Sequence, residues 1–358
     1  MMPSLPIWQF DLPLLVLVVL FAVVALSIRN LMGAAIVFGA YSFMMCLIWA
    51  GMGAVEVAFS EAAVGAGVST VFIVSTIYNT SATMRPRSRG ISFKLFIGAV
   101  VTVTGVFLLS ALPDFPDWGD PQSPGNATVA PYYINNSIPD THVPNLVPSV
   151  LADYRGFDTL LETVVVFIAC IGIYSILRKE SAKTSVDEPG DELAVPTQYE
   201  PGESLIVRQA SRFMVPFMQL FALYVIAHGH YSPGGGFQGG VILGASLILL
   251  AVSFDLKFLL VRCQEKPLML LVAAGVAIYA AVGLACLFMG ENYLDYDALD
   301  AVLPGERDMA RSHGILLVEI GVGITVMFSM VGIHINLCLL YTSPSPRDAT
   351  LSRMPSSA

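Results

Sequence analysis

Charged residues are scarce in this sequence. Asp, Glu, Lys and Arg make up 13% of the 358 residues, whereas a soluble domain carries roughly 25%. Hydrophobic residues make up 55%, and several apolar runs exceed the roughly 20 residues that cross a bilayer. This composition excludes an ordinary soluble domain. It predicts an all-α polytopic membrane protein.

Other common features are missing as well. No run of basic residues suggests nucleic acid as a partner, and the net charge of −9 comes from acids concentrated in the loops. The five cysteines show no C-x-x-C spacing, so neither a disulfide framework nor a metal site is indicated, and nothing points to a cofactor. The first residues lack a basic segment, which favours a retained helix over a cleaved signal. We find no internal repeat.

The apolar runs predict nine membrane spans. Spans six and seven are short and flank a glycine-rich loop, so part of that loop is expected at membrane depth. The predicted spans cover residues 12–28, 31–51, 54–78, 95–112, 157–177, 213–227, 241–254, 267–289 and 314–335.

The placement of Lys and Arg predicts the orientation. If nine spans alternate, three basic residues lie on one side, namely Arg155, Arg307 and Arg311. Thirteen lie on the other side: Arg29, Arg85, Arg87, Arg89, Lys94, Arg178, Lys179, Lys183, Arg208, Arg212, Lys257, Arg262 and Lys266. Positive residues favour the cytoplasmic side, so we expect the N-terminus outside and the C-terminus inside.

The loops divide the chain into modules. Residues 1–112 form a four-helix module, and residues 113–177 form a second module, made of a long external loop and the fifth helix. Residues 178–204 are charged and aperiodic, as expected of a cytoplasmic linker. Residues 205–337 form a third module of four helices, which includes an acidic external loop at 290–312.

The C-terminal sequence is unusual. The run "CLLYTSPSPRD", residues 338–348, resembles the translation of a transposase-type sequencing adapter. We therefore expect residues 338–358 to be non-native read-through. An ordinary disordered tail is the alternative.

Carboxylates inside apolar spans are costly, by at least about 2.5–3.5 kcal/mol, and are therefore functional candidates. Glu56 and Glu61 lie in the third span but point about 140° apart. Glu61 is roughly 10 Å inside the span and is followed by small residues that let another helix approach. Glu56 is nearer the edge, where an acid in contact with water is an equally good interpretation.

Asp158 and Glu162 lie in "GFDTLLETVVVF" and share a helix face at i, i+4. Asp158 is near the helix start, where capping of free N–H groups is the favoured interpretation. Glu162 is deeper. Two acids this close should titrate as a pair, which suits a proton relay.

Glu319 lies in the last span, six residues after His313. It is about 9–10 Å from the outer edge, a depth similar to that of Glu61 and Glu162. These three residues, together with Asp158 and Glu56, are the candidates for an ion path. A lateral row of carboxylates could pass a proton or cation between helices. The alternative is three unrelated acids, each satisfied by its own neighbours.

The segment "HGHYSPGGGFQGG", residues 228–240, joins the sixth and seventh spans. It lacks the GK[ST] ending of a phosphate-binding loop, and two histidines alone are too few for a metal site. We interpret it as a tight turn in which glycines allow unusual backbone angles and close packing. The turn residues are Pro233, Gly234, Gly235, Gly236, Gly239 and Gly240. His228, His230 and His313 are candidate proton antennae, because histidine titrates near neutral pH.

Four segments carry a family resemblance. "GHYSPGGGFQGGVILGASLILL" and "SHGILLVEIGVGITVM" resemble the B subunit of Mrp-type multisubunit Na+/H+ antiporters. "VEVAFSEAAVGAGVSTVFIV" and "DYRGFDTLLETVVVFIACIGIYSIL" resemble two successive modules of the A subunit's C-terminal extension, the first of which is a separate subunit in membrane-bound hydrogenases. The chain thus looks like a fusion of an A-subunit tail with a B subunit.

The resemblance implies an accessory subunit of the bacterial cytoplasmic membrane, not an enzyme. Its partners would be the A-, C-, D-, E-, F- and G-type subunits, and the complex would exchange H+ for Na+ or another monovalent cation. Glu61 and Glu162 match the family's proposed ion-path acids, and Glu319 matches the B-subunit acid. Leu161 stands where the family more often has glycine, but Glu162 is in place.

Two other functions stay open. The chain could belong to the membrane arm of an ion-pumping redox enzyme such as a hydrogenase, in which case hydrophilic redox subunits would be encoded nearby. It could also be a scaffold through which no ion passes.

Overall fold

The computed structural model describes residues 8–79, 90–117, 120–184, 205–254, 256–303 and 309–340. Within these ranges every regular element is helical. Eight segments of helix are long and apolar enough to cross a membrane, and Asp11–Ser27 is a shorter apolar helix. Together they correspond to the nine predicted spans, which confirms an all-α, multi-pass membrane protein.

The observed helices run close to the predicted spans. The N-terminal group comprises α1 (Trp8–Ser27), α2 (Leu31–Gly51), α3 (Val55–Ser60), η1 (Glu61–Ser69), α4 (Thr70–Asn79) and α5 (Ile91–Ser110). The rest comprises α8 (Gly156–Thr184), α9 (Leu205–His228), α10 (Gly236–Phe254), α11 (Leu256–Arg262), α12 (Glu265–Phe288) and α13 (Ala310–Leu340).

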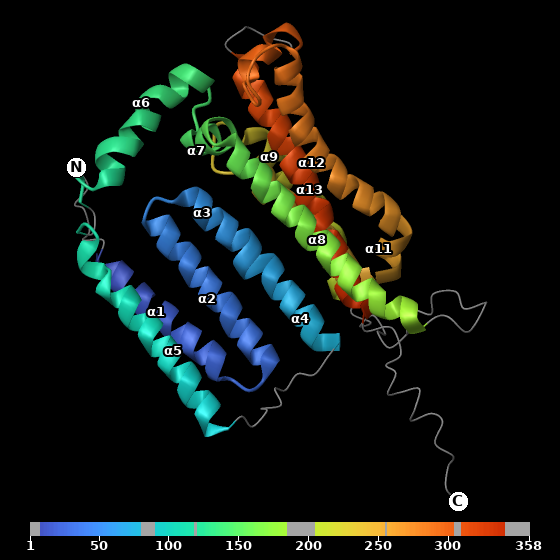
Figure 1. Cartoon of the computed structure of the whole chain (residues 1–358). Coiled ribbons are helices and arrows are strands. Elements are labelled where there is room, and N and C mark those ends of the chain that lie inside the picture. The colour runs from blue at the N-terminus through green and yellow to red at the C-terminus, as the bar shows by residue number, and fades with distance from the viewer. Residues whose placement is uncertain are drawn as a thin grey trace, which may run out of the picture.

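The helices form two neighbouring groups (Figure 1). Helices α1 to α4 stand together on one side, and α8 to α13 form a bundle on the other. Helix α13 is the centre of this bundle, where it packs against α8, α10 and α12. Helix α10 also contacts η1, so the two groups meet along the third span. Helix α5 exposes its apolar side chains along its whole length.

The predicted external loop is largely helical. It contains η2 (Leu112–Asp114), η3 (Gly125–Val129), α6 (Ala130–Thr141), α7 (Leu146–Pro148) and η4 (Ser149–Tyr154). The segment is rich in Pro and Asn, which favour turns. However, Pro148 lies in the short helix α7, which Asn145 caps by accepting a hydrogen bond from the amide of Val147. The loop at 290–312 contacts this segment: the Tyr296 hydroxyl group in η5 (Tyr296–Ala301) donates a hydrogen bond to a backbone carbonyl of η4.

The prediction that spans six and seven are short is wrong. Helix α9 begins at Leu205 and α10 at Gly236, so the turn between them covers residues 229–235 only. Gly236, Gly239 and Gly240 therefore lie in helix α10 and not in the turn. Glycine is a poor helix former in isolation, but tertiary packing overrides that preference here, because neighbouring helices pack closely against these glycines.

Loops predicted on one side of the membrane do meet at one end of the structure. Backbone and side-chain contacts join Asn145 to the 229–235 turn and Arg311 to Asp153. Which side of the membrane this end faces stays a prediction. Linker residues 185–204, Arg307 and tail residues 341–358 lie outside the described residues.

Candidate functional site

The turn at residues 229–235 is built from backbone conformations that favour glycine. Gly234 and Gly235 have φ angles of +151° and +146°. Residues that carry a side chain rarely adopt such angles. The amides of Tyr231 and Ser232 both donate to the carbonyl of His228 and close the turn. Both glycines are buried, so the turn folds inward onto the helices.

Glu319 of α13 is the group that this turn encloses. A Cβ atom on Gly235 would lie 3.0 Å from Glu319 Oε1, and one on Gly229 would lie 3.2 Å from Oε2. The residue is only 9% exposed, and Oε2 has no hydrogen-bond partner among the described residues. The glycines thus leave space for a buried carboxyl group that nothing in the described structure neutralises.

Glu56 of α3 reaches the same turn from the other helix group. Its Oε2 accepts a hydrogen bond from the amide of Gly234 at 2.9 Å, and its Oε1 accepts one from Asn145 Nδ2 at 2.8 Å. Glu56 is also the carboxylate whose charge acts on Glu319. The predicted row of Glu61, Glu162 and Glu319 stays a prediction. The carboxylate that the structure brings to the turn is Glu56.

Asn145 connects these parts and was not anticipated from the sequence. Besides Glu56, its side-chain amide donates to the carbonyl oxygens of Gly229 and Ser232, at 2.9 and 3.1 Å. Its backbone amide donates to the carbonyl of His230 at 2.9 Å. Asn145 lies in a loop between two prolines, where no periodicity marks it. A second link, from Gln238 Nε2 to Ser60 Oγ at 2.9 Å, joins α10 to α3.

Glu61 opens a nine-residue π-helix, η1. Its carboxylate lies against Gly65 of the same helix, beside Ser42 of α2, and its charge acts on Cys46. A side chain at Gly65 would collide with it. The small residues after Glu61 therefore make room for its own side chain as well as for α2. Segments of π-helix are often found at functional sites.

The structure gives Asp158 a charged partner on its own helix end. The Asp158 carboxylate is bound by the Arg155 guanidinium, with Oδ2 at 2.6 Å from Nε. The favoured interpretation was a helix cap; the adjacent Arg155 offers a charged partner, which binds a carboxylate more strongly than a neutral N–H does. Glu162 is exposed on the surface of α8. Glu162 and Glu319 both lie within electrostatic range of the buried Tyr279 of α12.

The three histidines have different surroundings. His230 is 4% exposed, and its Nε2 lies 2.8 Å from the carbonyl oxygen of Ser312. Burial lowers the pKa of His230, although the Ser312 contact opposes this effect. His230 therefore ties the turn to α13 in its neutral form. His228 is half-buried and stacks on Tyr224, and His313 is half-buried near His230. Their role as proton antennae stays a prediction.

A charged cluster fixes the same end of the molecule. Arg311 forms ion pairs with Asp153 of η4, at 3.5 Å, and with Asp295 and Asp297, both at 3.0 Å. The Asp153 side chain is 9% exposed, and its Oδ2 has no partner among the described residues. Burial raises the pKa of Asp153 to about 6, against the opposing effect of Arg311; nearby Asp297, Asp295 and Asp140 raise it further.

This pKa predicts how stability depends on pH. The folded state holds the Asp153 proton up to about pH 6, whereas the unfolded chain releases it near pH 3.8. The folded state binds more protons in this window, so stability should fall as pH rises from about 4 to 6 and stay low above it. We expect Asp153→Asn to reduce that fall by a few degrees in melting temperature. Thermal melting of the purified complex between about pH 4 and 7 measures this. An identical pH profile for variant and wild type would contradict it.

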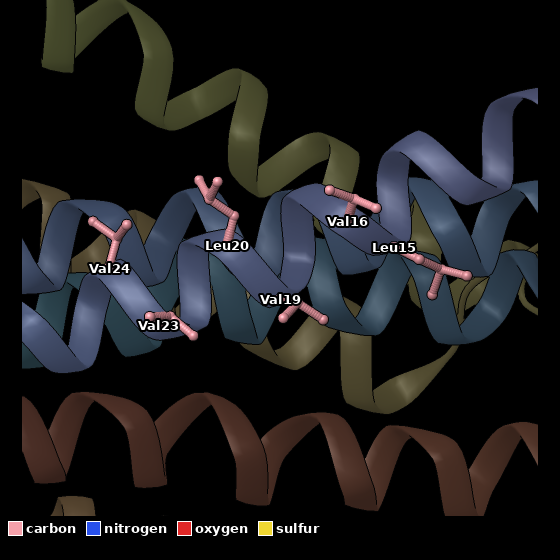
Figure 2. Close-up of a pocket in the computed structure, with 6 residues that line it drawn as sticks. All are labelled: Leu15, Val16, Val19, Leu20, Val23 and Val24. Atoms are coloured by element: carbon pink, nitrogen blue, oxygen red, sulfur yellow. The ribbon is translucent and has the colours of Figure 1, made fainter.

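An apolar groove lies away from this site, on α1. It has a volume of about 590 Å³ and is lined by aliphatic side chains alone (Figure 2). Its lining residues are Leu15, Val16, Val19, Leu20, Val23 and Val24. These side chains offer no polar atom to an ion, so the groove is not a candidate for the ion path.

Comparisons with known proteins identify the modules. Residues 206–332 match the family described as "Domain related to MnhB subunit of Na+/H+ antiporter". Residues 16–82 match the family of the MBH D subunit, and residues 121–192 match that of the MBH E subunit. The Na+/H+ antiporter B subunit of Bacillus subtilis is 31% identical over 131 residues, which are 90% of its length and 34% of this chain. The chain belongs to the family of Na+/H+ antiporter B subunits.

Further similarity joins this family to the N-terminal modules. The probable K+/H+ antiporter A/B subunit of Rhizobium meliloti is 27% identical over 224 residues, which are 59% of this chain. The chain spans only 22% of that relative. The Mrp complex of Dietzia sp. contains a chain that matches with a TM-score of 0.68 at 26% identity, covering 89% of the present protein and 34% of that chain. These similarities confirm the resemblance to a fusion of the A subunit's C-terminal modules with a B subunit.

A respiratory complex has a similar fold. The archaeal membrane-bound sulfane sulfur reductase contains a chain with a TM-score of 0.51 at 24% identity, which covers 69% of the present protein. At this identity the likeness shows the fold alone. The antiporter relatives are consistent with a transporter subunit and not with an enzyme.

Proposed function

We propose that this chain is an accessory subunit of a complex that exchanges monovalent cations for protons across the bacterial cytoplasmic membrane. Its intramembrane glutamates would contribute to the ion path. The observation that carries this proposal is the buried Glu319 carboxyl group, which has no partner at Oε2 among the described residues and is enclosed by a turn of glycines. Keeping an ionisable group in such a position costs free energy. A role in ion transport would explain why the protein retains it.

The other subunits of the complex would supply the remaining path. We expect A-, C-, D-, E-, F- and G-type subunits as partners, with Na+ or another monovalent cation as the substrate beside H+. Glu162 supports this expectation, because an exposed carboxylate on a membrane helix needs a protein or water neighbour. We also propose that the modules of the chain are separated near residues 112, 177 and 204.

Transport by everted vesicles tests the ion path. We expect Glu61→Gln, Glu162→Gln and Glu319→Gln each to lower cation-driven proton exchange by about tenfold or more, because glutamine cannot carry a proton or a charge. Glu291→Gln is the matched control: this acid is exposed, between α12 and α13, and should be dispensable. Native gels must show equal amounts of complex. Normal exchange by all three assembled variants would contradict the ion path and would favour the alternative, a scaffold through which no ion passes.

A further inference from the structure

The two carboxyl groups at the glycine turn have opposite surroundings. Glu319 is buried, its Oε2 has no donor among the described residues, and the closest parts of the turn are Gly229 and Gly235. Burying an ionised carboxylate without a hydrogen-bond donor or a counter-charge costs several kcal/mol. A neutral carboxyl group avoids that cost. The surroundings of Glu319 therefore suit the form that carries a proton.

Glu56 has the complementary surroundings. Each of its two oxygens accepts an N–H hydrogen bond, one from Asn145 and one from Gly234. An ionised carboxylate is an acceptor at both oxygens, whereas a protonated one must donate from one of them. The pattern of donors around Glu56 therefore suits the ionised form. Glu56 accepts a hydrogen bond from Gly234, and the Glu319 carboxyl group lies beside Gly235, the next residue of the same turn.

We propose, building on the ion path above, that the glycine turn encloses one exchangeable proton, carried by Glu319, and that Glu56 is the group that accepts it. In this step the O–H bond of Glu319 breaks and an O–H bond forms on Glu56. The negative charge moves from Glu56 to Glu319, so no other reactant is needed.

This exchange is linked to movement between the two helix groups. Each Glu56 oxygen keeps a second lone pair that can take the proton, but the two N–H contacts stabilise the ionised form, so the opening of one contact favours protonation. These contacts come from Asn145, in the loop after α6, and from the turn before α10. A small displacement of α3 from the turn would therefore make Glu56 a better proton acceptor, and return of the contacts would favour release of the proton.

Infrared difference spectroscopy of the whole purified complex tests where the proton resides. The spectrum of wild type minus Glu319→Gln, at neutral pH, is expected to contain the carbonyl band of one protonated carboxyl group, shifted in D₂O. Wild type minus Glu56→Gln should contain carboxylate bands and no such band. If Glu319→Gln fails to assemble, Glu319→Asp replaces it, and the band should then move instead of disappearing.

The outcomes separate this inference from the proposed function. Glu61→Gln is the control: the Glu61 carboxylate lies against Gly65 and Ser42, and its replacement should leave the Glu319 band unchanged. A wild-type spectrum without the Glu319 band, or one in which Glu56 provides it, overturns the inference even where vesicles of the variants have lost exchange. A Glu319 band combined with normal exchange by Glu319→Gln would instead exclude Glu319 from the ion path, and with it the exchange step.

Discussion

Gly236→Ala is expected to prevent the chain from assembling into its complex, with a loss of more than about tenfold. A Cβ atom at this position would overlap the carbonyl oxygen of Glu319 and lie 2.8 Å from its carbonyl carbon. Both are backbone atoms of α13, so no side-chain rotation relieves the overlap, and α10 and α13 would have to separate. Inserting even one methyl group into a tight interior commonly costs about 1–3 kcal/mol, and more where the backbone must move.

The measurement is the amount of assembled complex on a native gel of membrane extracts. Gly172→Ala is the matched control, because Gly172 is also a helical glycine but a Cβ atom there would meet nothing within 4 Å among the described residues. Alanine is the better helix former by up to about 1 kcal/mol, so this variant should assemble normally. A normal yield of the Gly236→Ala complex would show that α10 and α13 do not touch here in the assembled protein.

The helices were predictable because the membrane leaves few alternatives. A segment in the bilayer must satisfy its own backbone hydrogen bonds, so a long apolar run implies a helix and its length limits the ends. The start of α10 could not be predicted in this way. From the sequence, Gly236, Gly239 and Gly240 were predicted to be part of a turn. They lie in a helix, where α9 and α13 approach them closely.

The candidate site was predictable only in part. The cost of a buried charge singles out Glu61, Glu162 and Glu319 from the sequence alone. Their neighbours are a different matter, because helical periodicity relates residues within one helix only. The contact of Glu56 with Gly234 joins residues 178 positions apart, and that with Asn145 joins residues 89 apart. No local pattern in a single sequence encodes such pairs.

Asn145→Asp should be among the most damaging isosteric changes in this chain. The Asn145 amide is a donor to Glu56 Oε1 and to the carbonyl oxygens of Gly229 and Ser232. A carboxylate of the same shape would face three acceptors with none of the donors they require, and it would repel Glu56. We expect more than about a tenfold loss of proton exchange, measured in everted vesicles, and less complex on native gels.

The variants Asn145→Ala and Asn136→Asp show whether the defect comes from the lost hydrogen bonds or from the added charge. Alanine removes the hydrogen bonds but adds no charge, so it should be milder than aspartate. The Asn136 amide makes a solvent-exposed hydrogen bond to the carbonyl of Tyr132 within its own helix, so its aspartate variant should behave as wild type. Acidification to about pH 5 should partly restore Asn145→Asp, because a protonated carboxyl group regains one donor. Equal damage by alanine and aspartate would mean that the lost hydrogen bonds, and not the charge beside Glu56, determine the defect.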